Sequence, residues 1–164
     1  MSTLRHATSP GYADLEQGKY IAAVYPADPA YVPHARCLVV ATLDEWGLTV
    51  LAGDAELVVG EFGANAVSQD PLAGATAEIL VRVFRIARGV VIEVGDHRPS
   101  APPRPARRVA EDAEHGRGLL ISRAVSAELG WYCEGDWKIV WALLAEPRQR
   151  AARLSSRDQL GRAA

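Results

Sequence analysis

Two apolar runs in the middle of the chain restrict its fold more than any other feature. Residues 75–87 and 90–96 are rich in β-branched side chains, roughly alternate between apolar and polar, and are separated by Arg88-Gly89. A period of two interrupted by a short turn predicts a β-hairpin. Two further strand-like runs, 131–133 and 137–144, predict a second hairpin. Strands paired in this way favour an antiparallel sheet and disfavour the all-parallel sheet of a doubly wound fold.

One more strand and a first helix are predicted before these hairpins. Residues 19–26 are rich in β-branched and aromatic side chains and end at Pro26. Residues 28–46 carry apolar side chains at the i, i+3, i+4, i+7 spacing of an amphipathic helix. Asp28 is suited to cap the start of this helix, and Gly47 to end it.

Two further helices are expected. The second helix runs from Asp54, a capping residue, to about Gln69, and it contains Gly60 and Gly63. Each glycine costs a helix up to about 1 kcal/mol relative to alanine, so a close approach of another element is one explanation for them. The third helix is expected over residues 119–129, where Gly130 would end it.

The order of elements, β-α-α-β-β-loop-α-β-β, predicts an α+β fold. We expect a two-layer sandwich in which helices cover one face of a mixed, mostly antiparallel sheet. A length of 164 residues fits one domain. We expect a flexible lead-in over residues 1–18, the folded domain over residues 19–145 and an Arg-rich tail over residues 146–164. The Pro- and Arg-rich stretch within residues 97–115 is predicted to be a long loop, because neither a helix nor a central strand tolerates its prolines.

Composition excludes several classes of function. The net charge of −2 gives the whole molecule no attraction to nucleic acid or to anionic membranes. No apolar run approaches the length of a membrane span, and the first residues lack the apolar core of a signal peptide, so a cytoplasmic protein is expected. Cys37 and Cys133 have no CxxC partner, and the four histidines lack ligand spacing, so buried thiols are expected rather than a disulfide or a zinc site.

Glu61 and Asn65 are the first candidate site residues. They are four positions apart on the second predicted helix and therefore project from one face. An amide oxygen is suited to ligate a hard cation, and a carboxylate to accept a proton. The alternative is an ordinary solvated helix face.

Asp96 and the segment Gly116-Arg117-Gly118-Leu119 are further candidates. Asp96 ends a predicted strand, where its carboxylate could accept a hydrogen bond from an amino group, although a turn-forming aspartate is the simpler interpretation. The segment opens the third predicted helix, where free N–H groups and the helix dipole favour a phosphate. Glycines also begin many helices for packing reasons alone.

Taken in order, three motifs resemble those of the histidine-kinase-like ATPases (the GHKL family, with the Bergerat fold). They are AELVVGEFGANAV (55–67), VVIEVGDHRP (90–99) and GRGLLIS (116–122). Within that family the chain resembles the small anti-sigma-factor serine kinases and their stand-alone relatives, over about residues 19–145.

The resemblance implies a role for each candidate residue. Asn65 would ligate the Mg²⁺ that bridges the phosphates of ATP, and Asp96 would bind the adenine amino group. Gly116, Arg117, Gly118 and Leu119 would form the turn beside the phosphates, and residues 97–115 the ATP lid. Glu61 would be the general base that accepts the proton of a partner's serine.

Two functions remain open at this stage. One is a serine kinase that sequesters a sigma factor and phosphorylates an anti-anti-sigma (STAS-domain) partner. The other is a non-catalytic partner-binding module of the same fold, with weak or no ATP turnover. The second is favoured by Gly60, Ala64, Ser68 and Gln69, which replace residues common in the relatives. The resemblance also implies a homodimer, for which helix 28–46 and its neighbours could supply the interface.

Overall fold

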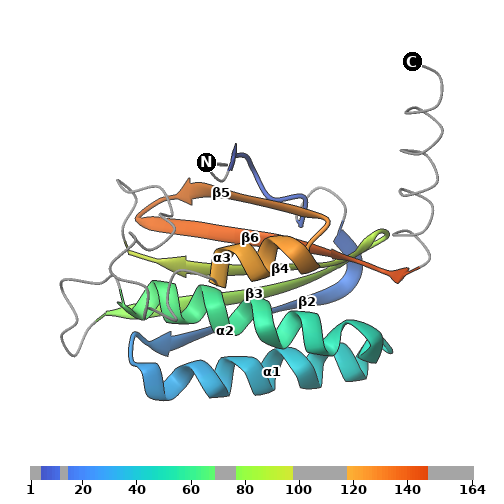
Figure 1. Cartoon of the computed structure of the whole chain (residues 1–164), viewed down its shortest axis with the longest axis horizontal. Coiled ribbons are helices and arrows are strands. Elements are labelled where there is room, and N and C mark those ends of the chain that lie inside the picture. Colours follow the sequence, from blue (N-terminus) through green and yellow to red (C-terminus); the bar gives the residue numbers. More distant parts are fainter. Residues whose placement is uncertain (1–4, 12–14, 69–76, 98–117, 148–164) are drawn as a thin grey trace.

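The computed structural model describes residues 5–11, 15–68, 77–97 and 118–147. These residues form two layers, a single β-sheet and a layer of helices on one of its faces (Figure 1). The predicted α+β class and two-layer arrangement are therefore confirmed. The predicted loop from residue 98 to 115 and the predicted tail from residue 148 to 164 lie outside the described residues.

The sheet has six strands in the order β1-β5-β6-β4-β3-β2. Every neighbouring pair is antiparallel except β1 and β5, which are parallel. Both predicted hairpins are confirmed, β3–β4 and β5–β6. The strands are β1 (Arg5–His6), β2 (Leu15–Pro26), β3 (Glu78–Ile86), β4 (Gly89–Asp96), β5 (Glu128–Glu134) and β6 (Trp137–Ala145).

The first two predicted helices are present with small differences at their starts. Asp28 does cap the chain, since its Oδ1 accepts a hydrogen bond of 2.8 Å from Ala30 N, but it caps a short 3-10 turn that leads into α1. The second helix begins at Ala52, two residues before Asp54. The helical elements are η1 (Pro29–Tyr31), α1 (Val32–Glu45), η2 (Thr49–Leu51), α2 (Ala52–Ser68) and α3 (Gly118–Val125).

The third helix is shorter than predicted. It ends at Val125, and residues 128–130 belong to β5 instead. The backbone N–H of Ser126 donates to Ser122 O, and the next N–H, that of Ala127, already donates to Leu143 O on β6. Pairing with β6 therefore overrides the local helix pattern. This is an effect of tertiary structure, which helix propensities do not include.

The described part of the predicted lead-in is bound to the sheet rather than loose. Arg5 and His6 pair with β5, and β2 begins at Leu15 rather than at residue 19. Ala7 O accepts a hydrogen bond of 2.7 Å from Trp141 Nε1 on the sheet face opposite the helices. Gly11 lies so close to the ring of Phe84 that a Cβ there would collide with it. Residues 5–11 thus cover part of the second face of the sheet.

Apolar side chains fill both faces of the sheet. On the helix side, α1 and α2 pack against buried residues of β3 and β4, namely Ile79, Val81, Val83, Val90, Ile92 and Val94. On the second face the buried cluster consists of Phe84, Ile86, Val91, Tyr132, Ile139, Trp141 and Leu143. Strands β3 and β4 contribute to both clusters, because successive side chains of a strand point to opposite faces.

A buried polar network also lies on the second face. Arg82 Nε is 2.8 Å from Glu93 Oε2 in the neighbouring strand, and the Tyr132 hydroxyl donates to the same carboxylate at 3.2 Å. Ser9 adds a further hydrogen bond to Glu93. Burial raises the pKa of the Glu93 carboxyl, an effect that Ser9, Arg82 and Tyr132 oppose. The network therefore holds the residue 5–11 segment against the sheet by polar as well as apolar contacts.

Of the two glycines of α2, Gly63 is explained by a close approach of α1, whereas a Cβ on Gly60 would make only ordinary van der Waals contact with α1. A Cβ on Gly63 would lie 3.2 Å from the side chain of Val32, and one on Gly60 would lie 3.6 Å from Arg36. A larger residue at position 63 would therefore push the two helices apart. Glycine here allows the helix axes to approach closely.

Three features considered from composition, namely the cysteines, metal ligands and membrane spans, can be compared with the described residues. Cys37 and Cys133 are not joined in a disulfide, but both are exposed rather than buried as expected. Within residues 5–11, 15–68, 77–97 and 118–147, no group of His, Cys, Asp and Glu side chains could hold a metal ion without other ligands. In the same ranges no helix has the length and apolar character needed to cross a membrane.

Candidate functional site

The orientation of α2 places Glu61 and Asn65 on the side of the helix that faces away from α1. Gly60 and Gly63 mark the side toward α1, and buried residues that include Phe62 mark the side toward the sheet. At 100° per residue, Glu61 and Asn65 lie opposite the α1 side, where α2 packs against α3. Both are half-buried. The prediction that they share one face is confirmed by their helical spacing.

Asp96 ends β4 in a buried position. Its exposed fraction is 5%, and its Oδ2 lies 2.7 Å from Nζ of Lys138, which is 3% exposed. The two residues are direct cross-strand partners on β4 and β6. Val94 faces the helices two positions earlier in β4, so Asp96 lies on the helix-covered face as well.

Figure 1 shows how these parts meet at one end of the molecule. The carboxyl end of α2, the carboxyl end of β4 and the amino end of α3 lie at the same end of the helix-covered face. Asn65 and Asp96 thus lie on elements that end there, and Glu61 is about one turn earlier on α2. Gly118 and Leu119 are the first residues of α3, whereas Gly116 and Arg117 lie outside the described residues.

The donor set suits a ligand that combines an amino-bearing base, phosphates and a hard cation. An ionised carboxylate accepts hydrogen bonds and donates none, so Asp96 is complementary to an amino group. The amide oxygen of Asn65 is a ligand that suits Mg²⁺, and the carboxylate of Glu61 can accept a proton. The first N–H groups of α3 have no partner within the helix and favour an anion.

Lys138 is a site residue that the sequence reasoning missed. A signal was present, because only two of the eighteen basic residues are lysines, and this one interrupts the apolar run WKIVWALL. Its contact with Asp96 depends on the register between two strands far apart in the chain. Next to this pair, the rings of His97 and Trp137 contact each other in a tilted arrangement with centroids 3.7 Å apart.

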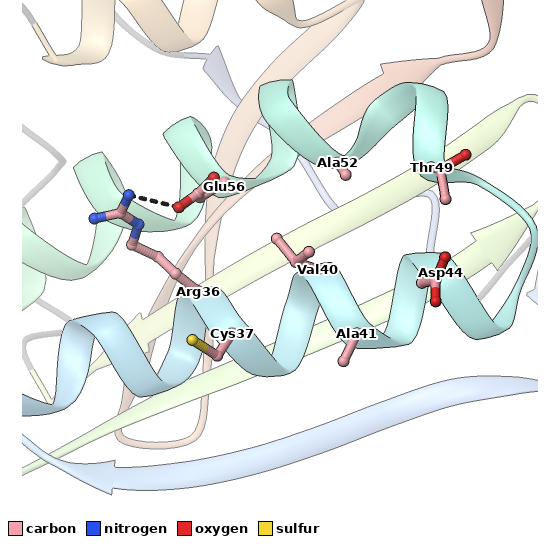
Figure 2. A pocket seen from close by; sticks show the side chains of 8 residues that line it. All are labelled: Arg36, Cys37, Val40, Ala41, Asp44, Thr49, Ala52 and Glu56. Carbon is pink, nitrogen blue, oxygen red and sulfur yellow. Dashed lines mark hydrogen bonds and ion pairs between the residues drawn. The ribbon is translucent and has the colours of Figure 1, made fainter.

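A shallow groove between α1 and α2 is separate from this region. Figure 2 shows the ion pair at its edge, in which Arg36 Nη2 lies 2.6 Å from Glu56 Oε1. Because Glu56 is on the α1 side of α2, the groove opens on the side opposite Glu61 and Asn65. Its lining consists of Arg36, Cys37, Val40, Ala41, Asp44, Thr49, Ala52 and Glu56.

Comparison with known proteins is consistent with this geometry. Residues 25–142, well over half of the chain, match the family model described as the histidine kinase-like ATPase domain. The matched range begins in β2 and ends in β6, so it includes α2, β4 and α3. No curated protein matches the sequence at a significant level.

The Asp96–Lys138 pair leads to a prediction about stability. Replacing one partner of a buried ion pair leaves an uncompensated charge, which costs about 3–5 kcal/mol. We expect Lys138→Met to lower the free energy of unfolding by about this amount, as measured by urea denaturation monitored by circular dichroism. The double variant Asp96→Asn/Lys138→Met, which carries neither charge, should recover most of the loss. A double variant as unstable as Lys138→Met would contradict the uncompensated carboxylate as the cause.

Proposed function

The chain belongs to the histidine kinase-like ATPase family, and from this premise we propose that it is a regulatory serine kinase of the anti-sigma-factor type. Membership of the family implies that the ligand is ATP, typically with Mg²⁺. The kinase activity, its partners and the residue roles are the proposal.

The observation that carries the proposal is the placement of Glu61 and Asn65. Both lie on the side of α2 that faces away from α1, and α2 ends at the same end of the helix-covered face where β4 terminates in the buried Asp96. In the proposed site Asp96 accepts a hydrogen bond from the adenine amino group, and the Asn65 amide oxygen ligates Mg²⁺. Gly116, Arg117, Gly118 and Leu119 are assigned to the phosphate side, with the amino end of α3.

Glu61 is proposed as the general base. It accepts the proton of a partner's serine hydroxyl while the serine oxygen bonds to the γ-phosphorus and the bond to the β-phosphate oxygen breaks, which releases ADP. Asn65 would hold Mg²⁺, which would supply charge neutralisation on the phosphates. The protein residues otherwise act by positioning, because phosphoryl transfer needs little covalent chemistry from the enzyme.

The proposed partners are a sigma factor and a STAS-domain anti-anti-sigma protein. They follow from the resemblance of the three sequence motifs, and the protein would sequester the first partner and phosphorylate the second. Direct contact with nucleic acid is not part of the proposal, since the net charge is −2.

A second candidate is a partner-binding module of the same fold with weak or no ATP turnover. It is favoured by Gly60, which serves the contact with α1, and by Ala64, an exposed position without a side-chain hydroxyl. Ser68 and Gln69 supply no cation at the place where relatives commonly have a basic pair. A missing cation near the phosphates removes stabilisation of the transition state.

The first prediction tests nucleotide binding. At about 100 times its dissociation constant, Mg-ATP stabilises the protein by about 2.7 kcal/mol. We expect the thermal midpoint to rise by roughly 5–10 °C, as measured by differential scanning calorimetry. Asn65→Ala should show no rise with Mg-ATP relative to its own midpoint without ligand. Absence of a rise in the wild type with both ATP and ADP would contradict ATP binding.

The second prediction tests phosphoryl transfer to STAS-domain candidates with radiolabelled ATP. Loss of a general base lowers the rate by about 10²–10⁴-fold. Glu61→Ala should lose transfer to this extent and keep the thermal shift with Mg-ATP. Glu56→Ala is the matched control, because Glu56 is on the same helix but pairs with Arg36 on the other side. A Glu61→Ala variant as fast as wild type would refute the assignment, and binding without transfer in the wild type would favour the second candidate function.

The proposed homodimer has support in the exposed edge of the sheet. Among the strands that the structure describes, β2 has a neighbour, β3, on one side only, and an edge strand offers backbone groups for pairing on its outer side. Among the described residues five large apolar side chains are exposed, and three of them, Leu15, Tyr20 and Val24, are on β2. Residues 20–25 carry no charge, so two copies of β2 could pair antiparallel about a two-fold axis without opposing like charges.

The third prediction concerns this edge. A lysine on an edge strand opposes strand pairing, so Val24→Lys should be monomeric where the wild type is dimeric, as measured by light scattering after size-exclusion chromatography. Val50→Lys is the matched control, because Val50 is 63% exposed, compared with 51% for Val24, but lies in η2. A wild-type monomer, or a Val24→Lys dimer, would refute the β2 interface.

A further inference from the structure

Lys138 is an ammonium group buried beside the residue assigned to the base of the nucleotide. Its Nζ lies 2.7 Å from Asp96 Oδ2, and the side chains of Lys138 and Asp96 are 4% and 7% exposed. We propose that Lys138 is a positioning residue that fixes Asp96 as an oriented carboxylate, so that the site selects a 6-amino purine over a 6-oxo purine. This inference rests on the proposed nucleotide binding.

The ion pair is rigidly placed by the backbone on both strands. Asp96 and Lys138 are cross-strand partners, and the preceding pair, Gly95 and Ile139, is in register as well. A Cβ on Gly95 would lie 2.7 Å from Ile139 and 3.1 Å from Trp137, so the backbone is closely packed immediately before Asp96. The backbone positions from which the Asp96 and Lys138 side chains project are therefore closely defined.

Stability alone does not account for a buried ion pair at this place. Exchanging such a pair for apolar residues of similar volume is often neutral or stabilising, because both charges lose their hydration when they are buried. At the end of β4, however, the pair performs a task that apolar residues would not. Lys138 compensates the charge of Asp96, so a carboxylate is held in a buried position at the end of the strand.

The ionised state of Asp96 determines which base it accepts. A carboxylate only accepts hydrogen bonds, whereas a protonated carboxyl group also donates one. A 6-amino purine donates to the carboxylate, while a 6-oxo purine presents an oxygen that the carboxylate repels. Without Lys138, the carboxyl group of Asp96 loses the ion-pair partner that holds it in one orientation, so the 6-amino group no longer meets a fixed acceptor. Lys138 thus acts on the base through Asp96.

The test compares the dissociation constants of ADP and inosine diphosphate, which differ at the 6-position of the purine, by isothermal titration calorimetry. A hydrogen bond to a charged group corresponds to about 10–100-fold in affinity, so the wild type should prefer ADP by about this factor. Lys138→Met should bring the ratio of the two constants close to one. Lys138→Arg, which keeps a cation, should retain the preference for ADP.

A second variant is available if Lys138→Met does not fold. Asp96→Asn/Lys138→Met carries no buried charge, and its amide both accepts from a 6-amino group and donates to a 6-oxo group. For this double variant, the ratio of the dissociation constants of ADP and inosine diphosphate should also be close to one.

Each outcome bears on the inference separately from the proposed function. An unchanged ratio in Lys138→Met, or equal weakening of both ligands, would overturn the positioning role and leave nucleotide binding intact. Loss of the preference in Lys138→Arg would also overturn it. A wild type that binds neither diphosphate would overturn the proposed function together with this inference.

Discussion

The burial of β4 on both faces and both edges is the constraint on which the rest of the structure depends. All eight of its residues are buried, between β3 on one side and β6 on the other. Its apolar side chains face the helices at Val90, Ile92 and Val94, and Val91 faces the second side of the sheet. A strand buried on both faces can pair with its neighbours in only one register, because a shift by one residue would exchange the side chains of the two faces. The position of Asp96 at its end, and the contact of Asp96 with Lys138, follow from that register.

The helix layer depends on a second close fit. Because Gly63 lets Val32 approach, α1 packs tightly along one side of α2. With the sheet below and α1 beside it, α2 has a fixed rotation about its axis, and that rotation decides where Glu61 and Asn65 point. The groove at Arg36 and the candidate nucleotide region are therefore on opposite sides of one helix.

Much of the fold could be predicted from local patterns, and the exceptions have physical causes. The two hairpins, the first two helices and the shared face of Glu61 and Asn65 follow from the periods of strands and helices. The end of α3 could not be predicted in the same way, since pairing with β6 decides it. Strand β1 is two residues long and has no period to detect. The ion pair of Asp96 depends on a register between distant segments, so the sequence could indicate Lys138 only by its unusual presence in an apolar run.

The parallel pairing of β1 with β5 has a consequence for how the chain is made. Residues 5–11 are synthesised well before the strands they contact, β5 and β6. The apolar side chains of β3 and β4 on the second face, such as Phe84 and Val91, are therefore made before the strands that hold residues 5–11 in place. Contacts between the two ends of a chain form slowly, and uncovered apolar surface favours aggregation. Pairing of β1 with β5 thus becomes possible only after β2, β3 and β4 have been made.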